Sequence, residues 1–263
     1  MTHTIAIETQ DLVKQFEGKR AVDQLCLKVP TGVFYGLLGP NGAGKSTTVG
    51  MLTGTLRPTS GKIRIFGKAF KPDAPAFKMQ MGVVTEEPPL FERLRGREQL
   101  LFTGRMYGLS LEETARRTDD LLAMVELDTH QRKLVADYSR GMRKKLAIAC
   151  ALIHAPRLLF FDEPFEGVDA VSSETIRRVL VGLTDRGATI LLTTHILEVA
   201  QRICQHVGII HRGSLAEEVD IDRLNAEGGD LAQRFRAAVG GQMDPQELPD
   251  WLRPAAFDDD DAT

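Results

Sequence analysis

The residues best suited to chemistry lie in one short stretch, residues 39–48, Gly-Pro-Asn-Gly-Ala-Gly-Lys-Ser-Thr-Thr. It fits the pattern G-x-x-x-x-G-K-[ST], in which glycines let backbone N–H groups surround phosphate oxygens. Lys45 would reach the terminal phosphates, and the Ser46 hydroxyl would coordinate Mg²⁺. The alternative is a glycine-rich turn with an incidental lysine, but three glycines, the lysine and the serine together favour a nucleoside triphosphate site.

Two acids, Asp162 and Glu163, follow the continuous apolar run of residues 158–161. Such a run suits a central parallel strand covered on both faces. The acids would then emerge at its carboxyl end, where ligands bind in open α/β sheets. Asp162 would hold the Mg²⁺ shell and Glu163 would polarise an attacking water. The alternative is an acidic turn without a ligand, and the phosphate loop favours the catalytic interpretation.

For two further residues, the sequence allows either a structural or a functional role. His195 follows the apolar run 188–194 and would reach the same sheet edge as Asp162, as a phosphate-sensing or a structural histidine. Phe16 lies just before the turn Glu17-Gly18. Its ring is either a stacking surface for a base or part of the core.

The elements that must position these residues follow from hydrophobic periodicity. A buried strand (33–38) is predicted before the phosphate loop and a helix (47–52) after it, its N-terminus facing the anion. The other predicted strands are 4–9, 24–29, 62–66, 81–84, 188–194 and a hairpin of 207–211 with 214–217. The other predicted helices are 95–108, one opened by the capping box Ser110–Glu113, 142–154, 171–186 and 231–239.

These predictions give an α/β fold with three parts. Residues 1–94 and 156–219 form a nucleotide-binding core with an antiparallel β-subdomain, residues 95–155 a helical subdomain, and residues 220–263 a C-terminal extension. The extension ends in the acidic run 258–261, which we expect to be disordered.

Composition narrows the setting. The formal net charge of the 263 residues is −3, and without the acidic run it is +1, so no basic excess suggests nucleic acid as a partner. Three cysteines with no C-x-x-C pair indicate reduced thiols and a cytoplasmic protein. The N-terminus lacks a signal-peptide pattern, and the longest apolar stretch (146–155) is about half a membrane span. Any membrane role would come through a separate partner.

The order of these motifs resembles the ATP-binding-cassette (ABC) ATPases, over about residues 4–217. Residues 138–142, Tyr-Ser-Arg-Gly-Met, occupy the place of the family signature, and Gly167-Val168-Asp169 looks like its D-loop. The resemblance implies a P-loop NTPase core, catalytic roles for Glu163 and His195, and metal ligation by Ser46 and Asp162. It implies trans-subunit ATP contacts from Ser139, Gly141 and Asp169. The implied ATP-binding residues are Phe16, Gly39, Pro40, Asn41, Gly42, Ala43, Gly44, Lys45, Ser46, Thr47 and Glu86.

Two departures from the family pattern stand out. Arg140 and Met142 replace a glycine and a glutamine of the signature, while Ser139 and Gly141, the residues that would meet phosphate, are retained. Glu86 occupies the position of the family's lid glutamine, which leaves the usual Mg²⁺ and coupling role of that position open.

The resemblance also implies partners and a location. Two cassettes, identical or different, would bury two ATP molecules with Mg²⁺ between them, and a separate transmembrane permease would hold the protein at the inner face of the cell membrane. The motifs look most like those of the two-component ABC-2-type exporters. The alternative is a soluble ABC-type ATPase acting on ribosomes or DNA; the single phosphate loop and absence of sustained heptads favour transport.

Overall fold

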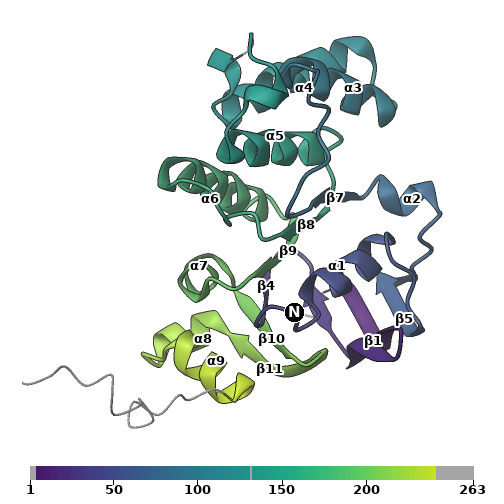
Figure 1. The fold of residues 1–263 in the computed structure, drawn as a ribbon, viewed down its shortest axis with the longest axis vertical. Helices are drawn as coiled ribbons and strands as arrows, with labels where there is room; N and C mark the ends of the chain where they lie inside the picture. The colour runs from purple at the N-terminus through teal and green to yellow at the C-terminus, as the bar shows by residue number, and fades with distance from the viewer. Residues whose placement is uncertain (1–3, 131, 241–263) are drawn as a thin grey trace, which may run out of the picture.

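The computed structural model describes residues 4–130 and 132–240 (Figure 1). In its first half the elements are β1 (Ile5–Phe16), β2 (Lys19–Leu25), β3 (Lys28–Pro30), β4 (Phe34–Leu38), α1 (Lys45–Thr53), β5 (Ser60–Ile65), β6 (Lys68–Ala69), α2 (Pro75–Lys78), β7 (Met81–Val84), α3 (Gly96–Met106) and α4 (Leu111–Met124). Two 3₁₀ turns, Asp128–His130 and Val135–Asp137, follow. The second half contains α5 (Arg140–Leu152), β8 (Leu158–Asp162), α6 (Ala170–Thr184), β9 (Thr189–Thr194), α7 (Leu197–Ile203), β10 (His206–His211), β11 (Ser214–Asp220), α8 (Ile221–Ala226) and α9 (Leu231–Val239).

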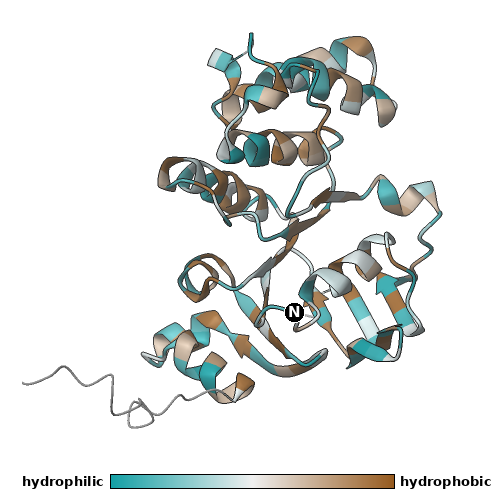
Figure 2. Ribbon diagram, in the orientation of Figure 1, coloured by the Kyte–Doolittle hydropathy of each residue, from teal (hydrophilic) through white to brown (hydrophobic). Residues whose placement is uncertain are grey.

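A six-stranded sheet of order β11-β10-β4-β9-β8-β7 forms the centre of the molecule. Its neighbouring strands are parallel except for β10 and β11, which form the predicted antiparallel hairpin. Strands β4, β8 and β9 are buried along their whole length and coloured mainly as apolar in Figure 2. This is the result expected of continuous apolar runs, because a parallel sheet has both faces covered.

The antiparallel N-terminal sheet has the order β2-β1-β5-β6, with β3 also paired to β1. Here the predicted strand boundaries are wrong. β1 continues well past residue 9, with register shifts that let it pair in turn with β3, β5 and β2. The predicted strand 24–29 is instead the end of β2 and the start of β3. Gln24 has a φ of 48°, which interrupts regular strand geometry at this point.

Helices α3, α4 and α5 pack together above the central sheet in Figure 1. Their shared core includes Leu100, Leu122, Leu146 and Ile153, all nearly inaccessible to solvent. Helix α5 begins at Arg140, two residues earlier than predicted, because the Ser139 hydroxyl caps it by accepting a hydrogen bond from the Met142 amide (3.2 Å). Half of the capping box predicted for Ser110 and Glu113 is present at the start of α4: the Ser110 hydroxyl accepts from the Glu113 amide (3.1 Å). The Glu113 carboxylate instead accepts from Arg116 and Arg117.

The tip of the β10–β11 hairpin contacts both the phosphate loop and the N-terminal sheet. The Gly213 amide donates to the Ala43 carbonyl (2.9 Å), and the Gly213 carbonyl accepts from the Asp23 amide (2.9 Å). The Ser214 hydroxyl donates to the Asp23 carbonyl (2.8 Å). A segment far along the chain therefore supports a loop near its beginning.

Three short helices, α2, α7 and α8, were not predicted from the sequence, whereas α9 has the predicted bounds. Each of the three is at most seven residues long, too short for a helical period to be distinguished from an irregular apolar run. The acidic run 258–261 lies outside the described residues. No helix of the described chain combines the length and the apolar character needed to cross a membrane.

Candidate active site

The phosphate loop connects β4 to α1, as predicted, and its glycines are required by close packing. A Cβ atom on Gly44, whose φ is 108°, would lie 2.4 Å from the Ala21 carbonyl oxygen. A Cβ atom on Gly39 would lie 2.5 Å from the Ile210 carbonyl oxygen. The loop is therefore held between β2 and β10, with α1 beginning at Lys45. Its free helix N-terminus and Lys45 ammonium are suited to bind a polyphosphate.

Asp162, at the end of β8, lies beside the first turn of α1. Its Oδ1 accepts a hydrogen bond from the Ser46 hydroxyl (3.2 Å) and another from the Thr193 hydroxyl of the neighbouring strand β9. The carboxylate is 7% exposed, so these bonds fix it in a single place. A hydroxyl and a carboxylate side by side are the hard oxygen ligands that Mg²⁺ prefers, and this pair fits the metal.

Glu163 brings the loop and the histidine together. Its Oε1 lies 3.7 Å from Lys45 Nζ and 3.1 Å from His195 Nδ1. Its Oε2 is buried and has no hydrogen-bond partner among the described residues. Glu163 has a φ of 46°, which is a costly backbone conformation for a residue with a Cβ atom. Its backbone amide donates hydrogen bonds to the carbonyl and to the hydroxyl of Thr193, each at 3.2 Å. One carboxylate oxygen is thus anchored while the other remains available.

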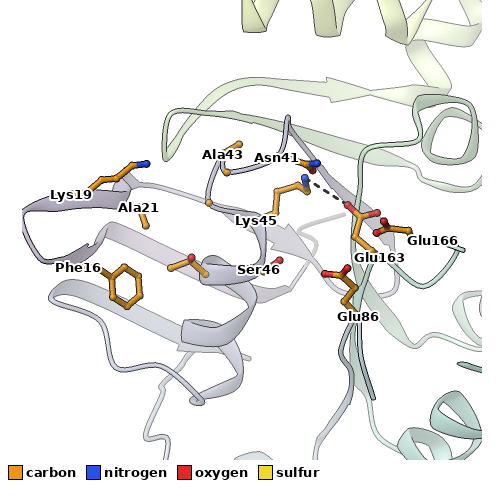
Figure 3. A pocket seen from close by; sticks show the side chains of 13 residues that line it. Phe16, Lys19, Ala21, Asn41, Ala43, Lys45, Ser46, Glu86, Glu163 and Glu166 are labelled. Carbon is orange, nitrogen blue, oxygen red and sulfur yellow. Dashed lines mark ion pairs between the residues drawn. The ribbon is translucent and has the colours of Figure 1, made fainter. Parts of the chain in front are cut away.

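Lys45, Ser46 and Glu163 line a cavity of about 510 Å³ between the N-terminal sheet and the end of β8 (Figure 3). Asp162 and His195 contact these lining residues but are not part of the lining. At one end Phe16 is 45% exposed, with Lys14 Nζ 4.9 Å from the centre of its ring. It is therefore a wall of the cavity and not part of the core. At the other end Glu86 lies on the same wall as Glu163 and Glu166, and so faces the cavity despite its exposure.

Three lining residues were missed from the sequence: Lys19, Ala21 and Glu166. Lys19 and Ala21 reach the cavity because β2 begins directly after the turn at Gly18, and that strand was placed too late in the sequence. Glu166 follows Glu163 by three residues, so its proximity to the acidic pair was a usable signal. Glu166 contributes a third carboxylate beside Glu86 and Glu163.

The signature residues form a second group that does not line the cavity. Ser139 and Gly141 begin α5, and Asp169 caps α6 by accepting from the Ser172 amide (2.9 Å). A Cβ atom on Gly141 would lie 2.6 Å from Ser172 Oγ and 2.9 Å from Asp169 Oδ2. The two helix N-termini are therefore in close contact, and both present hydrogen-bond donors outside this chain's own nucleotide cavity.

Comparisons with known proteins agree with this geometry. Residues 22–166 match the family model of the ABC transporter. The bacitracin transport ATP-binding protein BcrA of Bacillus licheniformis is 40% identical over 219 residues, covering 83% of this chain and 71% of that protein. The daunorubicin/doxorubicin resistance ATP-binding protein DrrA of Streptomyces peucetius is 38% identical, covering 89% and 71%. A solved ATP-binding subunit of an ABC transporter superposes with a TM-score of 0.80 at 31% identity, covering 89% of this chain and 99% of the other.

The parallel sheet, the phosphate loop and the acidic strand end define an ATP-hydrolysing protein with a P-loop core. The chain belongs to the ABC transporter family. Within it, the chain is the ATP-binding and ATP-hydrolysing subunit of a transporter, and its motifs resemble those of exporter subunits. The alternative of a soluble ATPase acting on ribosomes or DNA is not favoured, since the relatives are transport and resistance proteins.

Proposed function

We propose that Lys45, Ser46, Asp162, Glu163 and His195 perform ATP hydrolysis in the cavity described above. The observation that carries the proposal is the contact of Glu163 with both Lys45 and His195. In a site that binds ATP, Lys45 would move its charge to the phosphates, which frees Glu163 to accept a proton from the attacking water. His195, 43% exposed at the mouth of the site, would orient Glu163 and sense the terminal phosphate.

The remaining residues would bind the rest of the nucleotide. The phosphate loop, Gly39 to Thr47, would enclose the phosphates, and Phe16 would stack on the base. Ser46 and Asp162 would hold Mg²⁺, which neutralises phosphate charge when bound. Glu86 would approach the metal from the lid side of the cavity, where its carboxylate already lies.

We further propose that the complete site needs a second ATP-binding cassette. Ser139, Gly141 and Asp169 lie outside the cavity of their own chain, so they have no role in ATP binding unless a partner presents its cavity to them. The N-terminus of α5 would then contact the partner's nucleotide, because unpaired amides of a first helical turn attract phosphate. The same arrangement places Asp169 and its neighbours between the two sites.

A separate permease would convert hydrolysis into export. Its docking site, in this proposal, is an apolar groove of about 340 Å³ between β7 and the helices above it, lined by Val83, Pro89, Leu90 and Tyr107 among others. Phe102 and Met106 on α3 are 46% and 71% exposed beside this region. A mainly apolar groove beside exposed apolar side chains favours a protein partner. The protein would thereby be held at the cytoplasmic face of the membrane.

The docking proposal is tested by purification of the native complex from membranes. Val83, 39% exposed on the edge strand β7, is changed to Asp, with Leu111→Asp as a matched control on the far more exposed start of α4. We expect Val83→Asp to lose the co-purifying permease, because a carboxylate would be desolvated in the groove. Leu111→Asp should retain it. Equal recovery of the permease with both variants would contradict docking at this groove.

A further inference from the structure

Lys144 is a buried lysine that the site described above does not use. It lies on α5, one turn after Gly141, and is 2% exposed. A buried ammonium group is costly unless hydrogen bonds replace its water. Lys144 Nζ donates to the carbonyl of Glu163 (3.2 Å) and to the carbonyl of Thr85 (3.4 Å). Both acceptors belong to main chain that carries functional acids.

The two carbonyls follow the ends of two neighbouring strands, β7 and β8, at the catalytic edge of the sheet. Thr85 follows β7 and directly precedes Glu86, the acid at the lid position. The second carbonyl belongs to Glu163 itself, just beyond β8. One ammonium therefore connects the lid segment, the catalytic acid and the helix that begins with the signature residues. Burial lowers the pKa of Lys144, and the carboxylates of Glu86, Asp162 and Glu166 oppose that lowering, as expected of a cation near the acidic wall.

The next residue, Lys145, shows that buried lysines of α5 do not all bind the main chain of the active site. Lys145 is also buried, at 6% exposure, but its Nζ lies 3.3 Å from the Glu126 carboxylate. That carboxylate also accepts from Thr175 and Arg178, away from the nucleotide cavity. The two adjacent buried lysines thus have different partners. Lys145 binds a network of side chains, whereas Lys144 binds the main chain of the active site.

We propose that Lys144 is a positioning residue for ATP hydrolysis, which holds the Thr85 and Glu163 carbonyls at a fixed place relative to the signature helix. It touches no substrate and acts through the main chain that follows the neighbouring strands β7 and β8. Through these two hydrogen bonds, a movement of α5 would displace both Glu86, which follows Thr85, and Glu163, the proposed general base. This inference rests on the proposed catalytic role of Glu163.

The first test compares three variants in steady-state ATP hydrolysis. Lys144→Met keeps the side-chain length and removes the donors, Lys144→Gln keeps two N–H donors, and Lys145→Met removes the neighbouring buried lysine. We expect Lys144→Met to lower kcat about tenfold or more with the KM for ATP changed less than about threefold, because misplacement of a catalytic group affects chiefly the reacting state. Lys144→Gln should recover several-fold of that loss, and Lys145→Met should stay within about twofold of wild-type kcat.

The second test measures amide hydrogen exchange without nucleotide, which does not depend on Glu163 being the base. Peptides covering residues 82–91 and 161–169 should both exchange faster in Lys144→Met, and neither should change in Lys145→Met. If Glu163 were not catalytic, exchange would still increase while kcat stayed high, so the two failures are distinguishable. The inference is overturned if Lys144→Met matches Lys145→Met in kcat and exchange, or if Lys144→Gln is as impaired as Lys144→Met.

Discussion

At the scale of single residues, the charged groups of the site bind one another in the absence of substrate. Lys45 lies between the Gly39 carbonyl, to which it donates at 2.8 Å, and the Glu163 carboxylate. Asp162 is bonded by two hydroxyls, and Glu163 keeps one buried oxygen without a partner in the described chain. An anion that displaces the Glu163–Lys45 contact therefore leaves a carboxylate in place to act as a base.

The change Glu163→Gln tests that role. It keeps the shape of the side chain and removes its capacity to accept a proton. We expect ATP binding to persist while turnover falls by about 10²–10⁴-fold, the usual contribution of general-base catalysis. An ATP-bound dimer should accumulate, as visible by gel filtration with ATP. Turnover within a few-fold of the unchanged protein would remove Glu163 from the catalytic role.

Glu86 brings a carboxylate to the wall of the cavity in which we propose that ATP binds, on the same side as Glu163. At about 6 Å and an effective dielectric of about 20, one pair of unit charges is worth roughly 2–3 kcal/mol before screening, and exposure reduces this severalfold. Bound Mg²⁺ would neutralise the repulsion. We therefore expect Glu86→Gln to tighten Mg²⁺-free ATP binding by about fivefold and to weaken the dependence of affinity on Mg²⁺.

Titration of ATP with and without Mg²⁺ checks this expectation, and Glu87→Gln, on the next residue of the same exposed segment, is the control. The control should behave like the unchanged protein because Glu87 does not line the cavity. The same Mg²⁺ dependence in all three proteins would mean that Glu86 stays outside the bound site.

Most residues of the candidate site were predictable, because each follows a local pattern that fixes its place. Lys45 follows glycines after an apolar run, and Asp162 and His195 follow the two other buried runs that end at the same sheet edge. Lys19 and Lys144 were not predictable. Lys19 reaches the cavity because its own strand β2 begins earlier than predicted, and Lys144 reaches the active site through the packing of α5 against β7. Neither leaves a period or spacing in the sequence.

At the scale of elements, the close contact of α5 with α6 depends on a residue without a side chain. Gly141 lies in the first turn of α5, where a Cβ would overlap Ser172 and Asp169 at the start of α6. The longer helices were approximately placed by periodicity and caps, and the three short helices α2, α7 and α8 were missed. The contact of α5 with α6 depends on tertiary packing, which the sequence does not show. Strand boundaries in the N-terminal sheet were wrong for a similar reason, since one long strand pairs with three partners in turn.

The substitution Gly141→Ala should therefore lower the free energy of unfolding by about 1–3 kcal/mol, the usual effect of overpacking. Gly182→Ala, in α6, is the matched control because nothing lies within 4 Å of its Cβ position. There the substitution should stabilise by about 0.5–1 kcal/mol through helix propensity. Denaturant unfolding of the nucleotide-free proteins measures both. A similar change in the free energy of unfolding in the two variants would contradict close packing of α5 against α6 at Gly141.

At the scale of the whole molecule, the two groups of functional residues face different surroundings. The cavity contains the groups that would bind and hydrolyse ATP, while Ser139 and Gly141 lie apart from it. Both groups of residues were predicted from the sequence. Their separation in space, however, is visible only in the folded chain. A site divided between two copies would explain it.

Mixing two inactive variants tests such division. Lys45→Ala removes the phosphate lysine, and Ser139→Arg blocks the signature side. If the sites are composite and homodimers form, one intact site is reassembled in each mixed dimer, and the mixture should regain a part of the activity that each variant lacks alone. ATPase activity over a range of mixing ratios measures this, with each variant mixed with itself as the control. A mixture as inactive as its components would contradict shared sites in a homodimer.

The contact of the β10–β11 hairpin with the phosphate loop has a consequence for synthesis. Ala43, near the beginning of the chain, is bound by Gly213, and Gly39 packs against the carbonyl of Ile210. A chain emerging from the ribosome contains the phosphate loop long before the hairpin that contacts it, because synthesis begins at the N-terminus. The contacts that hold Gly39 and Ala43 in place therefore form only after Ile210 and Gly213 have been added to the chain.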